Sequence, residues 1–246
     1  MRTIIITILI MVFWQMLFAQ KTEVFFGESN RMDWSAGIIE MYDNGYYISG
    51  GFEGSDDYIY GWNIKSDKNL EILYDKVFEH SLGDIGISNS ITDSEGNIYI
   101  CGYISYTDQW PFISKMGPCG EYQWCKILNY EDEFNNGWSN DIILNNNNEI
   151  VLLTTLVSDD QIDMTHLIGL SNNGDVLWKK PYASRNDHSW IRQPIGSSII
   201  SHNDVYYISG KCYWPYPDDT THWFLRPLFI GIDSLLKKNG YCPSML

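Results

Sequence analysis

The chain has 246 residues, of which 44% are hydrophobic, 15% aromatic and 19% charged, so it can bury a full core and is neither disordered nor fibrous. Lysine and arginine total 16 against 31 aspartate and glutamate, and this net charge of -15 excludes nucleic acid as a partner, because nothing would neutralise its phosphates. The chain is rich in aromatic residues, and its 20 glycines with many asparagines favour tight turns over long helices, so composition predicts an all-β protein.

The first twenty residues are expected to form an export signal. Arg2 is followed by an apolar run over residues 4–18 that only two polar residues interrupt. A membrane-spanning helix needs about 20 apolar residues, so we expect a cleaved signal peptide over residues 1–20 rather than an anchor. The mature domain, residues 21–246, is then secreted or displayed at the cell surface, with a periplasmic location as the alternative and no membrane span.

A unit of about fifty residues repeats four times in the rest of the chain. Similar five-residue segments begin at positions 46, 98, 150 and 206, which are 52, 52 and 56 residues apart. Each segment follows a polar turn, and each turn follows an apolar stretch that contains Ile39, Ile91, Ile143 or Ile199. Each turn therefore joins two strands.

The second half of the unit also repeats. A third strand is predicted over residues 112–116, 166–170 and 229–232, with 62–64 as its degenerate first copy. Turn residues follow, and then a fourth strand in which an aromatic residue precedes a lysine by two positions: Tyr74 and Lys76, Trp124 and Lys126, Trp178 and Lys180. This spacing places the ring and the ammonium group on the same face of the strand.

Four short antiparallel strands that recur at this interval are typical of propeller blades, which stack because one such sheet cannot bury both faces alone. We therefore predict an all-β fold, a β-propeller of four four-stranded blades, with a β-sandwich or solenoid as the alternative. The fourth copy has no clear fourth strand. Residues 21–26 align with the fourth strand around Lys76 and could complete that blade, closing the ring. The other arrangement is a partial propeller, part of a wider ring.

Two motifs of the second copy connect the chain with a known family. Residues 93–102 read Asp-x-x-Gly-Asn-Ile-Tyr-Ile-Cys-Gly, and residues 112–126 begin Phe-Ile-Ser-Lys and end Trp-Cys-Lys. With these motifs, the chain resembles secreted bacterial β-propeller repeat proteins over about residues 21–240, although only the second copy matches well. The resemblance implies an exported propeller, often part of a larger surface protein, and implies no catalytic residues. Such proteins often carry a C-terminal sorting domain, and its absence here favours the partial propeller.

The loops between second and third strands form the predicted ligand face. In a propeller they emerge on the same rim as the connections to the next blade, and every copy carries acidic residues. The candidate ligand-binding residues are Asp56, Asp57, Tyr58, Asp108, Trp110, Asp159, Asp160, Asp163, Asp218, Asp219, His222 and Trp223. Aromatic planes beside carboxylates suit a carbohydrate, so we expect a glycan or a protein ligand.

Plainer interpretations of the same residues stay open. The acidic pairs could be solvated loop tips that keep an exported protein soluble, and the recurring Trp34, Trp138 and Trp190 could pack between blades. Clustered carboxylates also suit Ca²⁺, but no calcium-loop motif occurs, so calcium rests on composition alone and no other cofactor is predicted. The five histidines include no pair at zinc-binding spacing, and no nucleophile elbow occurs.

The sequence therefore predicts an exported, non-catalytic binding or scaffold module. One alternative is a secreted carbohydrate-active enzyme, since a glycosidase needs only two carboxylates about 5 to 10 Å apart. Another is a structural part of a larger propeller protein with no site of its own. Five cysteines are an odd number for an oxidising compartment; Cys212 and Cys242 are the best candidates for a disulfide, and buried thiols are the alternative.

Overall fold

The computed structural model describes residues 23–81, 83–105, 107–128, 134, 136–157, 163–182, 192–203, 205–216, 219–233 and 238–239. These residues form sixteen strands and no helix, which confirms the all-β prediction. None of them therefore belongs to a helix that could cross a membrane. The predicted signal peptide, residues 1–20, lies outside this described part of the chain.

The strands form four antiparallel sheets, here called blades one to four, each with its four strands in chain order. Blade one contains β1 (Asp33–Glu40), β2 (Tyr46–Glu53), β3 (Ile59–Ser66) and β4 (Ile72–Phe78). Blade two contains β5 (Asp84–Thr92), β6 (Ile98–Ser105), β7 (Gln109–Met116) and β8 (Tyr122–Ile127). Blade three contains β9 (Asn136–Leu144), β10 (Ile150–Val157), β11 (Asp163–Leu170) and β12 (Val176–Tyr182). Blade four contains β13 (Arg192–His202), β14 (Val205–Tyr216), β15 (Asp219–Asp233) and β16 (Lys238–Asn239).

The predicted repeat is confirmed at the level of strand pairing. The four similar segments all lie in the second strand of their blade, and three of the predicted isoleucines pair with it at equivalent positions: Ile39 with Tyr47, Ile91 with Tyr99 and Ile143 with Val151. In blade four the equivalent residue is Ile200, which pairs with Tyr207, and not the predicted Ile199. The connection there is one residue shorter, which moves the register by one position.

The turns between first and second strands are held by their own polar side chains. The carboxylate of Asp93 accepts hydrogen bonds from the backbone N–H groups of Glu95 and Asn97, both at 2.9 Å. Asn145 plays the same part in blade three. These local bonds give the chain a turn without help from the core, and they account for the aspartate that opens the repeat motif.

The core lies between consecutive blades. We call the side of a blade that faces the next blade along the chain its leading face, and the opposite side its trailing face. Tyr47, Tyr99 and Val151 lie on leading faces, and each is fully buried by the blade that follows. Ile100, Leu152 and Ile208 lie on trailing faces and are equally buried. Each blade therefore depends on its neighbours to keep its apolar side chains from water.

The repeated aromatic and lysine pair joins one blade to the next. A Cβ atom on Gly120 would lie 2.7 Å from the Tyr74 ring, and one on Gly174 would lie 2.8 Å from the Trp124 ring. Each ring thus packs against the turn between the third and fourth strands of the following blade. The Lys76 ammonium group also donates a hydrogen bond to the Gly120 carbonyl. Glycine is required at this turn for its positive φ and for the close approach of the ring.

A buried carboxylate links the first strands of three blades. Asp141 of blade three accepts a hydrogen bond from the Asn89 side-chain amide of blade two. Its other oxygen accepts from the Ser198 hydroxyl at 2.9 Å and from the Ile199 N–H at 2.8 Å, both in blade four. Asp141 is only 6% exposed, so hydrogen bonds from within the protein satisfy its buried oxygens.

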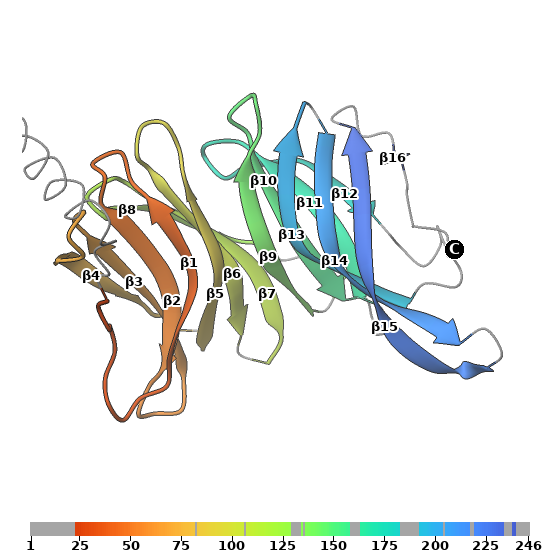
Figure 1. The fold of residues 1–246 in the computed structure, drawn as a ribbon, viewed down its shortest axis with the longest axis horizontal. Coiled ribbons are helices and arrows are strands. Elements are labelled where there is room, and N and C mark those ends of the chain that lie inside the picture. Colours follow the sequence, from red (N-terminus) through yellow and green to blue (C-terminus); the bar gives the residue numbers. More distant parts are fainter. Residues whose placement is uncertain are drawn as a thin grey trace, which may run out of the picture.

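The four blades form an open row. Figure 1 shows blade one at one end of the row and blade four at the other. The outer edge of β15 pairs with β16 at Gly231 and Ile232, and residues 23–26 lie beside blade one. The predicted closure of the ring by an N-terminal strand is therefore wrong, because β16 occupies the edge that this strand would need. The fold is a four-bladed β-propeller whose ring is not closed, which is the partial propeller of the two predicted arrangements.

Candidate functional site

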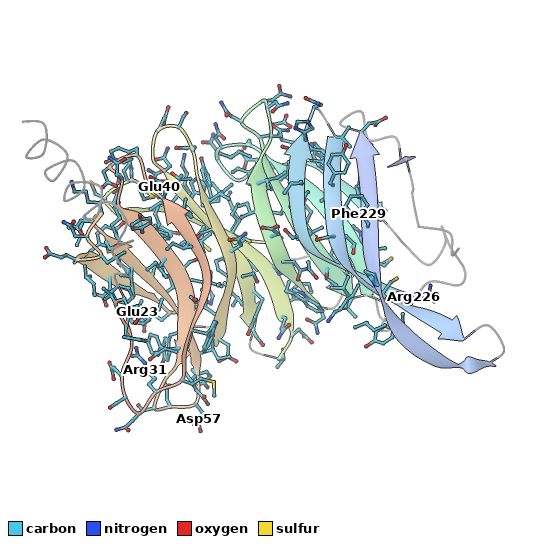
Figure 2. All side chains as sticks on the ribbon, viewed as in Figure 1. Glu23, Arg31, Glu40, Asp57, Arg226 and Phe229 are labelled. Carbon is cyan, nitrogen blue, oxygen red and sulfur yellow. The ribbon has the colours of Figure 1, made fainter. Side chains whose placement is uncertain are left out.

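The turn between β2 and β3 forms the end of blade one, and Figure 2 shows Asp57 at its tip. The Gly54 N–H donates to the Tyr58 carbonyl at 2.7 Å, and the Asp57 N–H donates to the Gly54 carbonyl at 3.2 Å. Asp57 has a φ of 66°, a left-handed conformation that aspartate tolerates better than most residues. The turn thus has a defined backbone conformation that carries the acidic side chains of Asp56 and Asp57 and the half-exposed Tyr58.

Asp56 is fixed by a neighbouring tyrosine. Its carboxylate accepts a hydrogen bond from the Tyr60 hydroxyl at 2.6 Å and a weaker one from the Tyr58 N–H at 3.4 Å. The bond from Tyr60 lowers the pKa of Asp56 below its ordinary value, and the same bond raises the pKa of Tyr60. Asp56 is therefore ionised at neutral pH and has a defined orientation.

This turn meets the connection between β4 and β5. A hollow of about 460 Å³ is lined by residues from both segments: Asp56, Tyr58, Tyr60, Glu79, His80, Ser81 and Gly83. We call the side chains of Asp56, Tyr58, Tyr60, Glu79 and His80 the first-blade rim. Here the structure brings together the two kinds of loop that the propeller topology predicts on one rim.

A second hollow, of about 510 Å³, adjoins the first and shares Asp56, Tyr60 and Glu79 with it. Its floor is aromatic, because the Phe52 and Tyr60 rings stack at 5.3 Å with an angle of 20° between them. The Arg31 guanidinium group lies 3.9 Å from the centre of the Phe52 ring and pairs with Asp33 at 2.6 Å. We call the two adjoining hollows the groove, and together they offer aromatic rings, carboxylates and the Arg31 cation.

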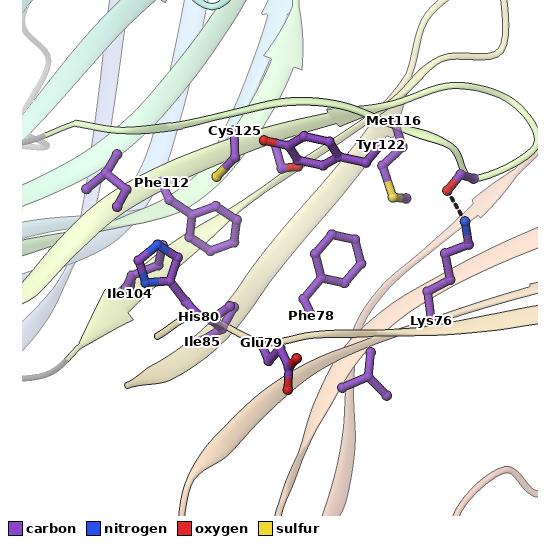
Figure 3. Close-up of a pocket in the computed structure, with 14 residues that line it drawn as sticks. Lys76, Phe78, Glu79, His80, Ile85, Ile104, Phe112, Met116, Tyr122 and Cys125 are labelled. Atoms are coloured by element: carbon purple, nitrogen blue, oxygen red, sulfur yellow. Dashed lines mark hydrogen bonds between the residues drawn. The ribbon is translucent and has the colours of Figure 1, made fainter. Parts of the chain in front are cut away.

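A third cavity, of about 500 Å³, lies between blades one and two (Figure 3). Its lining is mainly apolar and includes Phe78, Phe112 and Cys125, and Glu79 and His80 line it as well as the rim. Burial raises the pKa of the Cys125 thiol to about 11, so this cysteine is a protonated packing group. The cavity gives the rim an apolar extension.

The predicted residues of blade two lie at the equivalent place in their own blade, and neither Asp108 nor Trp110 lines the two hollows beside the first-blade rim. Asp108 is exposed and accepts a hydrogen bond from the Thr107 hydroxyl at 3.3 Å, and Trp110 is half-buried on β7. A recurring bond supports both loops, since the Ile59 N–H donates to Asp84 at 2.9 Å and the Gln109 N–H donates to Asn136 at 3.0 Å.

The predicted residues of blades three and four are placed differently or fall outside the described residues. Asp159, Asp160 and Asp218 lie outside them, and Asp163 is the first residue of β11. Asp219, His222 and Trp223 were expected in a loop but lie in β15, which pairs with β14 in a long hairpin that projects from the row (Figure 1). The structure therefore brings together Asp56 and Tyr58 of the candidate set, and the projecting strand lies at the far end of the row.

Sequence reasoning missed four residues that line the hollows: Arg31, Tyr60, Glu79 and His80. The repeat could have pointed to Tyr60. It pairs with Phe52 in blade one, at the position where the predicted Trp110 pairs with Ile104 in blade two. Among the described residues, no three histidine, cysteine, aspartate or glutamate side chains are grouped as a metal site requires. Three of the acidic loop residues, Asp159, Asp160 and Asp218, lie outside the part searched, so calcium stays a prediction.

Comparison with known proteins finds structures of similar fold but does not identify a family for this chain. No family model matches the sequence, and no curated protein matches it. A thermostable family-43 glycoside hydrolase is similar at a TM-score of 0.50 and 14% identity, over 87% of this chain and 77% of that one. An endo-1,4-β-xylanase from Bacteroides thetaiotaomicron has a TM-score of 0.47 and 11% identity, over 84% of this chain and 72% of that one. A protein of unknown function from Bacteroides caccae has a TM-score of 0.35 and 9% identity, over 87% and 82%.

Identities this low speak for the fold alone, and the hydrolase with a TM-score of 0.50 supports the propeller architecture. The resemblance to secreted repeat proteins stays a prediction.

Proposed function

We propose that this protein is an exported, non-catalytic binding module whose first-blade rim takes a carbohydrate. The observation that carries the proposal is the Asp56–Tyr60 pair, an ionised carboxylate locked against an aromatic ring at the junction of two shallow hollows. Export rests on the predicted signal peptide over residues 1–20.

The chemistry of the groove fits a sugar. Sugar hydroxyl groups donate hydrogen bonds to carboxylates, and Asp56 and Glu79 both line the two hollows. The C–H faces of a sugar ring pack on aromatic planes, which Tyr58 and Tyr60 provide at the edge of the groove. Each hollow falls in the range of about 300 to 1,000 Å³ that is usual for small-ligand sites.

Catalysis is the second candidate, because Asp56 and Glu79 are two carboxylates in one groove. A glycosidase requires one of its carboxyl groups to stay protonated as the general acid, which needs a raised pKa. The hydrogen bond from Tyr60 lowers the pKa of Asp56, which suits the ionised base or nucleophile and not the general acid. In an enzyme the general acid would therefore have to be Glu79, and the hydrolysis assay below tests that alternative.

A glycan array followed by calorimetric titration of the best-bound glycan tests the proposal. Asp56→Asn should weaken binding by about 10-fold, because it removes the charged acceptor from the groove. Tyr58→Ala should weaken it as well. The matched control is Glu71→Gln, which changes an exposed carboxylate in the β3–β4 turn of the same blade and should leave the affinity unchanged.

Three outcomes would count against this function. Binding to no glycan would contradict it, and so would a glycan whose affinity is indifferent to Asp56→Asn. Hydrolysis of the bound glycan that is lost in Asp56→Asn or Glu79→Gln would favour the enzyme instead.

A further inference from the structure

The cavity between blades one and two lies where blade two departs from the repeat. On the trailing face of each blade, one residue of the third strand pairs with the second-strand residue that is Ile100 in blade two. This third-strand residue is a buried isoleucine in the other three blades: Ile64, Ile168 and Ile230. In blade two it is Ser114, which lines the cavity. A small side chain at a position that the repeat fills with isoleucine leaves space between the two blades.

The fourth strand of blade two adds to this space. Cys125 pairs with Ser114, whereas the equivalent residue of blade three is Lys179, which pairs with Ile168. The Ser114 hydroxyl donates a hydrogen bond to the Trp124 carbonyl at 3.2 Å, and the raised pKa of the Cys125 thiol keeps it protonated at neutral pH. Ser114 and Cys125 therefore give the cavity a wall that is small and carries no charge.

The other walls suit an aromatic ring. Phe78 of blade one and Phe112 of blade two line the space, and Figure 3 shows both rings there with Met116 nearby. Aromatic rings pack well against one another, and methionine sulfur makes favourable contacts with them. An apolar cavity of about 150 Å³ is enough to bind benzene, so a cavity of about 500 Å³ has room for a substituted ring.

The charged groups of the lining favour a neutral ring. The Lys76 ammonium group donates a hydrogen bond to the Gly120 carbonyl (Figure 3) and lies 5.5 Å from the centre of the Tyr74 ring. With its charge held there, the lysine contributes its aliphatic stem to the lining. Glu79 is the acidic residue of the lining, so an anionic ring would meet repulsion and a neutral ring would not.

Glu79 and His80 connect the cavity with the first-blade rim. Both residues line the cavity, and both also line the hollow of about 460 Å³ that contains Asp56 and Tyr60. The Gly83 N–H donates to the His80 carbonyl at 3.1 Å, so a tight turn in the β4–β5 connection fixes where these two residues lie. A substituent of a sugar at the rim is thus a direct neighbour of the cavity.

We propose that this cavity binds a neutral aromatic ring, carried as a substituent by the sugar that the first-blade rim takes. The ring would lie between Phe78 and Phe112, and its link to the sugar would pass beside Glu79 and His80. That a sugar carries the ring rests on the proposed function, whereas binding of the ring rests on the cavity alone.

Calorimetric titration with methyl and phenyl β-D-glycosides of glucose, galactose, mannose and xylose tests the proposal. A phenyl glycoside should bind about 10-fold more tightly than the methyl glycoside of the same sugar, since burial of about 60 Å² of apolar surface is worth such a factor. Phenol serves as the ring alone, and saturation-transfer NMR should detect its binding.

Ser114→Ile is the informative variant, because it gives blade two the isoleucine that the other blades carry. It should remove the gain from the phenyl group and the binding of phenol, and it should leave the affinity for methyl glycosides unchanged. Ser94→Ile is the matched control, because it makes the same substitution in an exposed turn of the same blade, and it should bind as the wild type does. Circular dichroism verifies that each variant is folded, and Cys125→Leu offers a second way to fill the cavity.

Equal affinities for methyl and phenyl glycosides would overturn the proposal, and so would a phenyl gain that both cavity-filling variants retain. Failure of the proposed function looks different. Asp56→Asn should weaken methyl and phenyl glycosides alike, so a loss of this kind without any phenyl gain upholds the rim and removes the ring. Phenol binding that Ser114→Ile abolishes, with no methyl glycoside bound and no effect of Asp56→Asn, upholds the cavity and removes the sugar.

Discussion

Replacing Asp141 with alanine is expected to loosen three blades at once. The Asp141 carboxylate is the common acceptor for Asn89 of blade two and for Ser198 and Ile199 of blade four. Alanine removes the acceptor and leaves four donors in a buried region, since the Ile142 N–H also donates to this carboxylate at 2.8 Å. A buried donor without a partner costs more than the hydrogen bond itself contributed.

The expected loss follows from the number of donors. Each hydrogen bond to a charged group is worth about 1.5 to 3 kcal/mol, but bonds that share an acceptor are not additive, so we expect a loss of about 3 to 5 kcal/mol. A domain of this size is stable by about 5 to 15 kcal/mol, and the melting temperature should fall by about 10 °C. Asp141→Asn keeps one acceptor oxygen and should lose about half as much.

Urea unfolding monitored by tryptophan fluorescence measures this loss. The control is Asp175→Ala, because Asp175 is an exposed aspartate whose ion pair with Lys126 spans 3.7 Å, and its removal should cost less than about 1 kcal/mol. A loss below about 1 kcal/mol for Asp141→Ala as well would refute the reasoning, since the carboxylate would then contribute no more than a surface charge.

Three further changes test single contacts. Gly120→Ala should lower the free energy of unfolding by about 1 to 3 kcal/mol in urea, because Gly120 has a φ of +77° and an added Cβ would lie 2.7 Å from a ring of blade one. Asp43→Asn should lower the free energy of unfolding by about 1 kcal/mol above about pH 4, because the hydrogen bond from Lys65 lowers the pKa of Asp43. In unfolding titrations, the difference in stability between wild type and variant should shrink as the pH falls through that lowered pKa. At about pH 8, mass spectrometry should find Cys119 alkylated by iodoacetamide and Cys125 unmodified, because Cys119 is exposed whereas burial raises the pKa of Cys125 to about 11. An unchanged Gly120→Ala, a pH-independent difference for Asp43→Asn, or equal alkylation of both cysteines would contradict the corresponding contact.

The strands and turns could be predicted from the sequence because their causes are local. Alternation of apolar and polar residues sets the strands, and residues such as Asp93 and Asn145 make the turns with their own side chains. Four four-stranded blades follow from repetition of this local pattern. Even the register error at Ile199 has a local cause, a connection that is one residue shorter.

Closure of the ring could not be predicted in the same way. It depends on how far each blade turns relative to its neighbour, which is set by the sum of many side-chain volumes between blades. The edge strand β16 consists of Lys238 and Asn239 alone and carries no periodic signal. The N-terminal segment has a better sequence match to a fourth strand, but the edge that it would pair with is already occupied.

The candidate site was predictable only where one loop supplies it. Asp56 and Tyr58 belong to a turn whose acidic and aromatic residues are visible in the sequence. Glu79 and His80 come from a different connection, and only the packing of blade one on blade two brings them to the same hollow. The expected loop at Asp219 became strand because β14 and β15 continue to pair far beyond the body of the blade.

Hydrogen exchange of the protein with and without its best-bound glycan would locate the ligand directly. Binding at the first-blade rim predicts slower exchange in two segments that are separate in the chain, residues 54–60 and 79–83, with no change in the hairpin of β14 and β15. Protection of that hairpin with unchanged exchange at 54–60 would contradict the proposed site.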